Sequence, residues 1–102
     1  MQNFFGFVPR SMRQSTMVND ENINLLNNIR ADIIGELDAI NQYSVHMAQS
    51  TNSQMTKVWR AIRSEEQVHV GELMYMLFKL DPESYENYKM GLEEAEKLTS
   101  KQ

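Results

Sequence analysis

The chain has 102 residues, of which 41% are hydrophobic and none is cysteine, and its formal net charge is −4 at pH 7. A chain of this length forms one domain, and two or three helices bury only a thin core by themselves, so self-association is expected. Without cysteine there are no disulfides, thiolate zinc sites or iron–sulfur clusters, and a metal would have to bind Glu, Asp or His. The acidic balance disfavours nucleic acid and membrane surfaces as partners.

Residues 1–18 are predicted to form an irregular N-terminal arm. Their apolar run is interrupted by Pro9 and is far shorter than the roughly 20 residues that span a bilayer. The arm also lacks the basic start of a secretory signal, so a cytoplasmic location is expected. Four apolar residues could anchor the arm on a hydrophobic groove of the chain itself or of a partner: Phe4, Phe5, Phe7 and Val8.

Residues 19–98 are predicted to form an all-α domain that begins with a long helix. Asn19 and Asp20 are good N-cap residues, and the next proline is Pro82. Apolar residues then recur at spacings of three and four or their multiples, which is the pattern of one buried helix face. They are Leu26, Ile29, Ile33, Ile40 and Met47. The polar run 48–53 ends this first helix.

A second helix should run to about Leu80, because Thr51 and Gln54 have the form of a capping box. Its expected inward residues are Met55, Val58, Ile62, Leu73 and Met76. The short polar loop makes the first two helices antiparallel neighbours.

Asp81 and Pro82 should end the second helix and begin another, with Asp81 as the cap and Pro82 at the first helical position. This predicts a short third helix over about 82–98 and a tail over 99–102. Tyr85, Tyr88, Leu92 and Ala95 should share one side of this helix. No segment has the pattern of a strand.

Three polar side chains interrupt the inward faces of the first two helices. Glu36 stands in the first stripe, and Glu66 and His69 occupy adjacent inward positions of the second. If the hairpin folds about Thr51, Glu36 and Glu66 lie at the same level. Unpaired buried carboxylates are costly, and one cation would relieve that cost for all three groups.

These three residues are half of a known ligand set. Ferritin-like di-iron proteins use one Glu from each of two helices and Glu-x-x-His from each of two others. A two-fold dimer would therefore form a four-helix bundle holding two metals, and oxygen and imidazole ligands suit iron or manganese.

The stretches Glu36-Leu-Asp-Ala-Ile-Asn-Gln-Tyr43 and Arg63-Ser-Glu-Glu-Gln-Val-His69 resemble the encapsulated ferritins. The resemblance implies a homodimer, a higher ring such as a decamer, two irons per dimer, and work inside an encapsulin nanocompartment. It makes Glu36, Glu66 and His69 the iron ligands.

The resemblance also implies lesser roles for two residues near the ligands. Tyr43 matches a tyrosine that hydrogen-bonds a ligand glutamate, and Asp38 matches one acid on the route by which iron arrives. Glu65 and Glu72 flank the site on the second helix, where a solvated face is the default interpretation, and one of the two could guide incoming iron.

The chain departs from the family pattern at three places. Gln42 replaces a tryptophan and Gly35 replaces a second acid of the iron route. Family members usually carry a shell-targeting extension beyond the third helix, whereas this sequence stops at Lys101-Gln102, shortly after that helix. A truncated chain, a fusion to the shell protein or docking through the N-terminal arm would each account for this.

The expected function is that of a ferroxidase, which oxidises Fe(II) to Fe(III) for iron storage or detoxification. The first alternative is a peroxide-reducing di-iron protein of rubrerythrin type, although the absence of cysteine counts against its usual electron-transfer domain. The second alternative is a metal-free helical adaptor in which the inward Glu and His make only polar contacts between helices.

Overall fold

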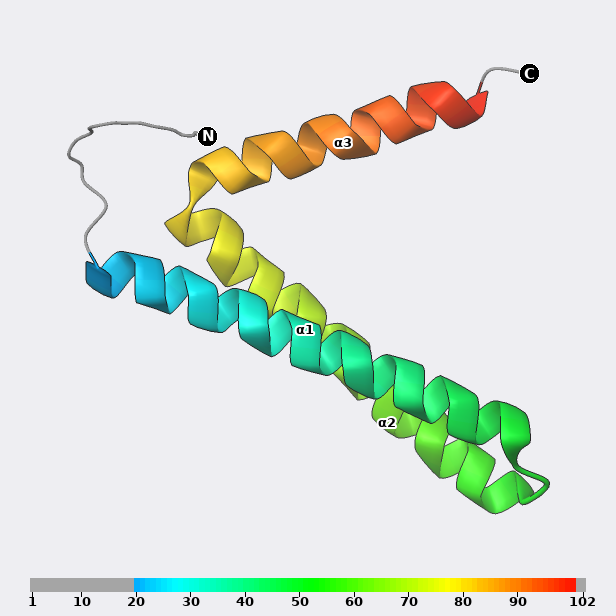
Figure 1. The fold of residues 1–102 in the computed structure, drawn as a ribbon. Coiled ribbons are helices and arrows are strands. Elements are labelled where there is room, and N and C mark those ends of the chain that lie inside the picture. Colours follow the sequence, from blue (N-terminus) through cyan, green and yellow to red (C-terminus); the bar gives the residue numbers. More distant parts are fainter. Residues whose placement is uncertain (1–19, 101–102) are drawn as a thin grey trace.

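The computed structural model describes residues 20–100, with side chains from residue 22 onward, and the arm predicted over 1–18 lies outside the described residues. Three helices follow one another in this part of the chain: α1 (Asp20–Gln49), α2 (Ser53–Leu80) and α3 (Pro82–Ser100). Figure 1 shows α1 and α2 side by side as an antiparallel hairpin, with α3 directed away from it. The described residues contain no strand, so the all-α prediction is confirmed.

The turn between α1 and α2 is closed by Asn52 rather than by Thr51. The Asn52 Oδ1 atom accepts a hydrogen bond from the Met55 backbone N–H at 2.9 Å, and Asn52 has an extended backbone. Asn52 is therefore the N-cap of α2, and the capping box predicted at Thr51 and Gln54 is wrong by one residue. An asparagine is an equally good cap, because its short side chain reaches a free N–H group in the first turn, here that of Met55.

Asp81 joins α2 to α3. Its backbone N–H donates to the Leu77 carbonyl at 2.9 Å and so ends α2, while its Oδ2 accepts from the Ser84 hydroxyl at 2.6 Å at the start of α3. Pro82 occupies the first position of α3, as predicted. The helix continues to Ser100, two residues beyond the predicted end, so Thr99 and Ser100 are helical and not part of a tail.

The core of a single chain is small and lies at the α3 end of the hairpin. Only Ile29 and Leu77 count as buried among the described hydrophobic residues, at 8% and 1% exposure. Ile33, Ile40 and Met47 are half-buried, as their positions in the stripe predict.

Three residues predicted to point inward on α2 are instead exposed: Met55, Val58 and Met76. The prediction was wrong for a single chain because these side chains lie on a face that one hairpin layer leaves uncovered.

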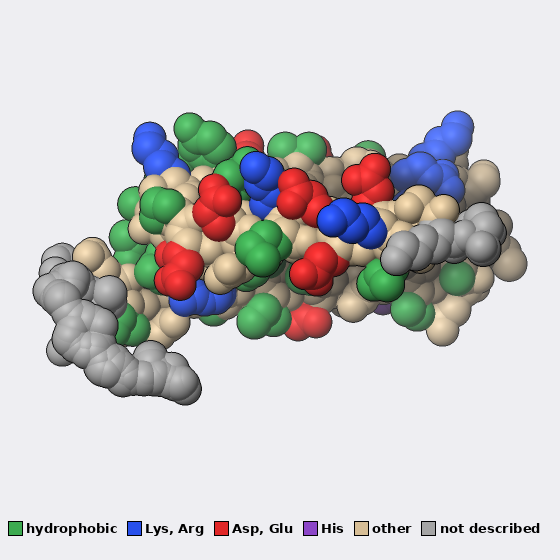
Figure 2. Space-filling model, turned by 90° about the horizontal axis from the view of Figure 1, so that it is seen from above, with side chains coloured by type: hydrophobic (Ala, Val, Ile, Leu, Met, Phe, Trp, Pro, Cys, Tyr) green, Lys and Arg blue, Asp and Glu red, His purple; other side chains and the backbone are tan. Residues whose placement is uncertain are grey.

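Much apolar surface stays exposed on α3 as well, where no residue is buried. Its best contacts are edge-on ring contacts of Tyr85 and Tyr88 with Phe78 at the end of α2, at 5.5 and 5.4 Å between centroids. Seen from the side on which α3 lies in Figure 1, hydrophobic, acidic and basic side chains are interspersed (Figure 2). Among the described residues, no helix is long and apolar enough to cross a membrane.

Candidate metal centre

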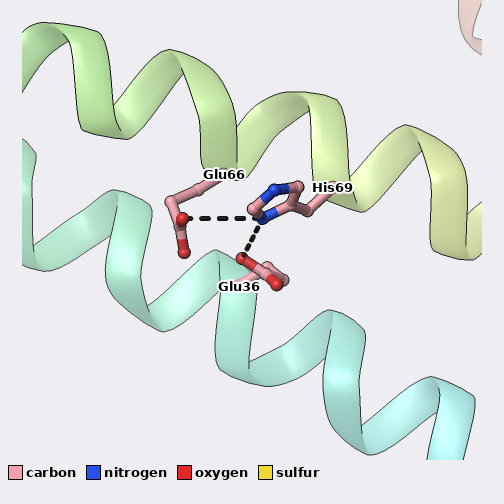
Figure 3. Close-up of side chains that lie close together, drawn as sticks. All are labelled: Glu36, Glu66 and His69. Atoms are coloured by element: carbon pink, nitrogen blue, oxygen red, sulfur yellow. Dashed lines mark ion pairs between the residues drawn. The ribbon is translucent and has the colours of Figure 1, made fainter.

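Glu36, Glu66 and His69 meet midway along the hairpin. One ligand atom from each residue lies within 4.8 Å of the other two, so the three could hold one metal ion. Glu36 projects from α1, and Glu66 and His69 project from successive turns of α2 (Figure 3). Residues three apart on a helix share a face, which explains why both α2 side chains reach the same point. The predicted convergence at one level of the hairpin is present.

The imidazole of His69 stands between the two carboxylates. His69 Nδ1 lies 3.5 Å from Glu36 Oε1 and 3.6 Å from Glu66 Oε1. The two glutamate side chains are 23% and 20% exposed, while the histidine side chain is 47% exposed. The site is therefore shielded by the helices on one side and open on the other.

One of the metal-binding oxygen atoms has no hydrogen bond within the protein. Glu36 Oε1 is buried and has no hydrogen-bond partner, although His69 Nδ1 is near it. A buried carboxylate oxygen left unpaired costs free energy, and a cation placed among the three donors would remove that cost. Two carboxylates and one imidazole are also a suitable donor set for iron or manganese. The residues present fit a metal ion.

The neighbouring Glu36 changes the acidity of Glu66. A hydrogen bond with the Glu36 side chain, burial and repulsion from the Glu36 charge, in that order, raise the pKa of Glu66, and His69 opposes them. Without a metal, a proton on Glu66 is thus held more firmly than on an ordinary glutamate. Since a ligand must give up its proton, metal and proton compete for this carboxylate.

The three side chains lie in an open groove of about 590 Å³ that runs between α1 and α2 toward the α3 end of the hairpin. Asp32 and Glu72 line the same groove. Sequence reasoning missed Asp32, although it stands four residues before Glu36 and so on nearly the same face of α1. Gly35 lines the groove too, and a Cβ atom built there would meet nothing within 4 Å, so its neighbours do not require a glycine.

The chain is similar to a ferritin-like–encapsulin shell fusion protein of Pyrococcus furiosus, with 41% identity over 75 residues. That match covers 74% of this chain, which spans about a fifth (22%) of the fusion protein. It is also similar to the encapsulin nanocompartment cargo protein EncC of Myxococcus xanthus, with 30% identity over 97 residues, 95% of this chain and 68% of that protein.

A solved structure supports the same relationship. The encapsulated ferritin domain from Pyrococcus furiosus matches with a TM-score of 0.76 and 35% identity, over 88% of this chain and 95% of that domain. The chain belongs to the encapsulated ferritin family. No protein-family model matches it. The resemblance read from the two helix stretches is thereby confirmed.

Within this encapsulated ferritin, Tyr43 lies half-buried and seven residues beyond Glu36 on the same face of α1. Its ring makes an edge contact with His46, at 6.2 Å between centroids, and His46 in turn lies 5.3 Å from the Trp59 ring of α2. These aromatic rings pack the hairpin on the turn side of the site. A hydrogen bond from Tyr43 to a ligand glutamate remains a prediction.

Of the acids expected to guide iron, Asp38 and Glu65 lie apart from the groove, whereas Glu72 lines it. Asp38 is exposed and lines a separate shallow hollow on α1 together with Gln42 and His46. Glu65 is exposed next to Glu66 and contributes the weakest of the effects that raise the pKa of Glu66. Asp32 and Glu72, which share the groove with the three donors, are better placed for incoming cations.

Proposed function

We propose that this encapsulated ferritin is a ferroxidase whose di-iron centre is formed by Glu36, Glu66 and His69 of two copies of the chain. The observation that supports the proposal most directly is the cluster of three donor atoms within 4.8 Å, with the buried oxygen of Glu36 left unpaired. One chain supplies too few donors for two irons, and a second copy doubles the set.

The sequence of α2 supports a two-fold axis at the level of the site. Met55 lies eleven residues before Glu66, and Leu80 lies eleven residues after His69. Ile62 and Leu73 each lie four residues outside the ligand pair in the same way. Two antiparallel copies of α2 would thus place like residues opposite each other, for example Met55 against the partner's Leu80.

A second hairpin on this face would also cover apolar surface. Met55, Met76 and Leu80 are 39%, 41% and 44% exposed in the single chain. Burying such side chains stabilises a complex by about 25 cal/mol per Å² of apolar surface. The dimer would therefore be held by apolar contacts on both sides of the metal ligands, in the manner of a four-helix bundle.

In the proposed reaction Fe(II) is the substrate. Two Fe(II) ions held by the paired sites each give up one electron, and one molecule of O₂ or peroxide takes up both electrons. The carboxylates of Glu36 and Glu66 favour the more highly charged Fe(III) product, since negative ligands stabilise it more than Fe(II). His69 would bind iron through a ring nitrogen that carries no proton.

The partner in the cell is proposed to be an encapsulin shell. Two relatives carry encapsulin in their names, one as a fusion to the shell and one as a nanocompartment cargo protein. The chain would accordingly work in the cytoplasm inside a nanocompartment, as a dimer or as a higher ring such as a decamer. Co-expression with an encapsulin, followed by isolation of shells, tests whether the chain is retained within them.

Oxidation of Fe(II) in air tests the ligand assignment. Glu66→Ala and His69→Ala should each slow the rise in Fe(III) absorbance more than about 10-fold, the lower end of the loss seen for groups that only orient metal ligands. Glu65→Ala is the matched control, because Glu65 is the exposed neighbour of Glu66, and it should stay within about twofold of wild type. Metal analysis should give about one iron per chain. Equal rates in all four proteins, or iron-free protein from iron-supplemented cells, would leave the metal-free adaptor as the better explanation.

A further inference from the structure

A second groove, on the other side of the hairpin, lies where the three helices converge. We call it the junction groove, and it measures about 220 Å³. It is lined by Arg30, Ile33 and Ile34 of α1, Met74 and Leu77 of α2, and Tyr88 of α3. Residues of all three helices line the groove, so it lies where α3 departs from the hairpin, and Figure 1 shows α3 diverging from α1 at this point.

The junction groove has the character of a docking site for apolar side chains. Leu77 at its base is 1% exposed, whereas Ile34 and Tyr88 at its sides are 61% and 44% exposed. An occupant would therefore cover both of these side chains and would rest on the best-packed part of the core. Arg30 adds a cation that can stack on an aromatic ring.

We propose that the Phe4–Val8 segment of the N-terminal arm of the same chain occupies the junction groove. Three of the four phenylalanines of the chain lie in this segment, at positions 4, 5 and 7. Burying an aromatic side chain of this size is favourable, because its apolar surface is removed from water. The segment therefore gains from a groove, and its rings match both the apolar lining and the Arg30 guanidinium.

The arm is attached at the start of α1, close enough to reach the junction groove of the same chain. Ile33 and Ile34 lie about 20 Å along α1 from Asp20, at 1.5 Å per residue. Phe7 is thirteen residues before Asp20, and thirteen extended residues reach about 43 Å. The arm can thus turn back beside α1, and a tethered segment has a local concentration in the millimolar range, which favours it over the arm of another copy.

Charge supports the same arrangement. The arm carries Arg10 and Arg13 and no acidic residue through position 19. The adjoining helix α3 has more glutamates than lysines, with Glu83 and Glu86 in its first two turns near Tyr88. With Phe4–Val8 in the groove, the two arginines would follow directly beside an acidic helix.

Engineered disulfides test the position and the identity of the occupant, and the absence of native cysteine keeps the readout clean. The pair Val8→Cys with Ile34→Cys should form a disulfide within one chain under mild oxidation. The matched control, Val8→Cys with Val45→Cys, has its second cysteine on a similarly exposed site (51%) of α1 away from the groove, and it should form little. Disulfide-linked dimers would show that the arm of a second copy occupies the groove. Equal disulfide yields from the two cysteine pairs would show that the arm does not dock there. Either result overturns the proposal.

Cleavage by trypsin after Arg10 and Arg13 tests docking without added cysteines. Ile34→Glu should speed cleavage in the arm at least about tenfold, while Val45→Glu should leave the rate as in wild type. Both positions are exposed, so neither substitution threatens the hairpin core, and circular dichroism checks that the helices persist. Wild-type cleavage as fast as that of Ile34→Glu contradicts the proposal, whether or not the protein oxidises iron.

Discussion

The α1–α2 interface is built differently at its α3 end and at its middle. At the α3 end, Ile29 and Leu77 are 8% and 1% exposed, and the contacts are apolar. At the middle, Glu36 and Glu66 are 23% and 20% exposed, and a buried oxygen lacks a partner. The apolar end fixes the register of the two helices, and that register brings the polar groups of the middle together. Stability and the capacity to bind a cation are thus placed in different parts of one interface.

Leu77→Ala should have the largest effect on stability, because it opens a cavity in the small core. Removing a fully buried leucine side chain typically lowers the free energy of unfolding by about 2 to 5 kcal/mol. Val68→Ala is the control on the same helix, since Val68 is 59% exposed and should change stability by less than about 0.5 kcal/mol. Urea unfolding at one protein concentration measures both. A similar loss in the two variants would show that the α3 end does not hold the hairpin.

Metal binding should have the next largest effect, and it acts on the middle of the interface. In a metal-free dimer four carboxylates, two each from Glu36 and Glu66, would repel one another or take up protons. Divalent metal at about 100 times its dissociation constant adds about 2.7 kcal/mol, which is about a hundredfold in association. Light scattering with Fe(II) under nitrogen and with chelator should show this shift toward larger assemblies.

Glu36→Ala tests the repulsion between the carboxylates by removing two of them from the dimer. The variant lacks two of the four carboxylates, so it should associate more readily than wild type in chelator and lose most of the response to metal. If both proteins associate equally in chelator and neither responds to Fe(II), the glutamates do not meet across a two-fold axis.

The sequence predicted the middle of the interface better than the uncovered faces. Glu36, Glu66 and His69 could be found because they interrupt regular apolar stripes and because equal distances from the turn set their level. The exposure of Met55 and Val58 was not predictable, because an apolar stripe does not say whether its cover is the same chain or another copy. Asp32 was missed for a related reason, since an acid next to a stripe has the pattern of a solvated face.

Asn52→Ala should have a smaller effect, and it compares the actual cap with the one predicted from sequence. Loss of the Asn52 Oδ1 bond to the Met55 N–H should cost about 1 kcal/mol of the free energy of unfolding. Thr51→Ala changes the adjacent exposed residue and should cost less than about 0.5 kcal/mol. Both follow from urea unfolding. A larger loss for Thr51→Ala would restore the capping box as the start of α2.

The smallest expected effect is a pH dependence of the metal-free protein, and it comes from Glu66. Its pKa is raised in the folded chain, chiefly by the hydrogen bond with Glu36, then by burial and by the Glu36 charge. A folded state that binds a proton more tightly than the unfolded state is favoured at low pH. The contribution is therefore fully present below the ordinary glutamate pKa and is lost as pH rises through the raised pKa of Glu66.

Glu36→Gln removes the negative neighbour, so it should return the Glu66 pKa toward its ordinary value and flatten this part of the curve of stability against pH. Carboxyl carbon NMR of Glu66 in chelator measures the pKa directly, and urea midpoints over the same pH range measure the linked stability. If Glu66 titrates at the same pH in wild type and in Glu36→Gln, then Glu36 does not raise the pKa of Glu66, and this prediction is wrong.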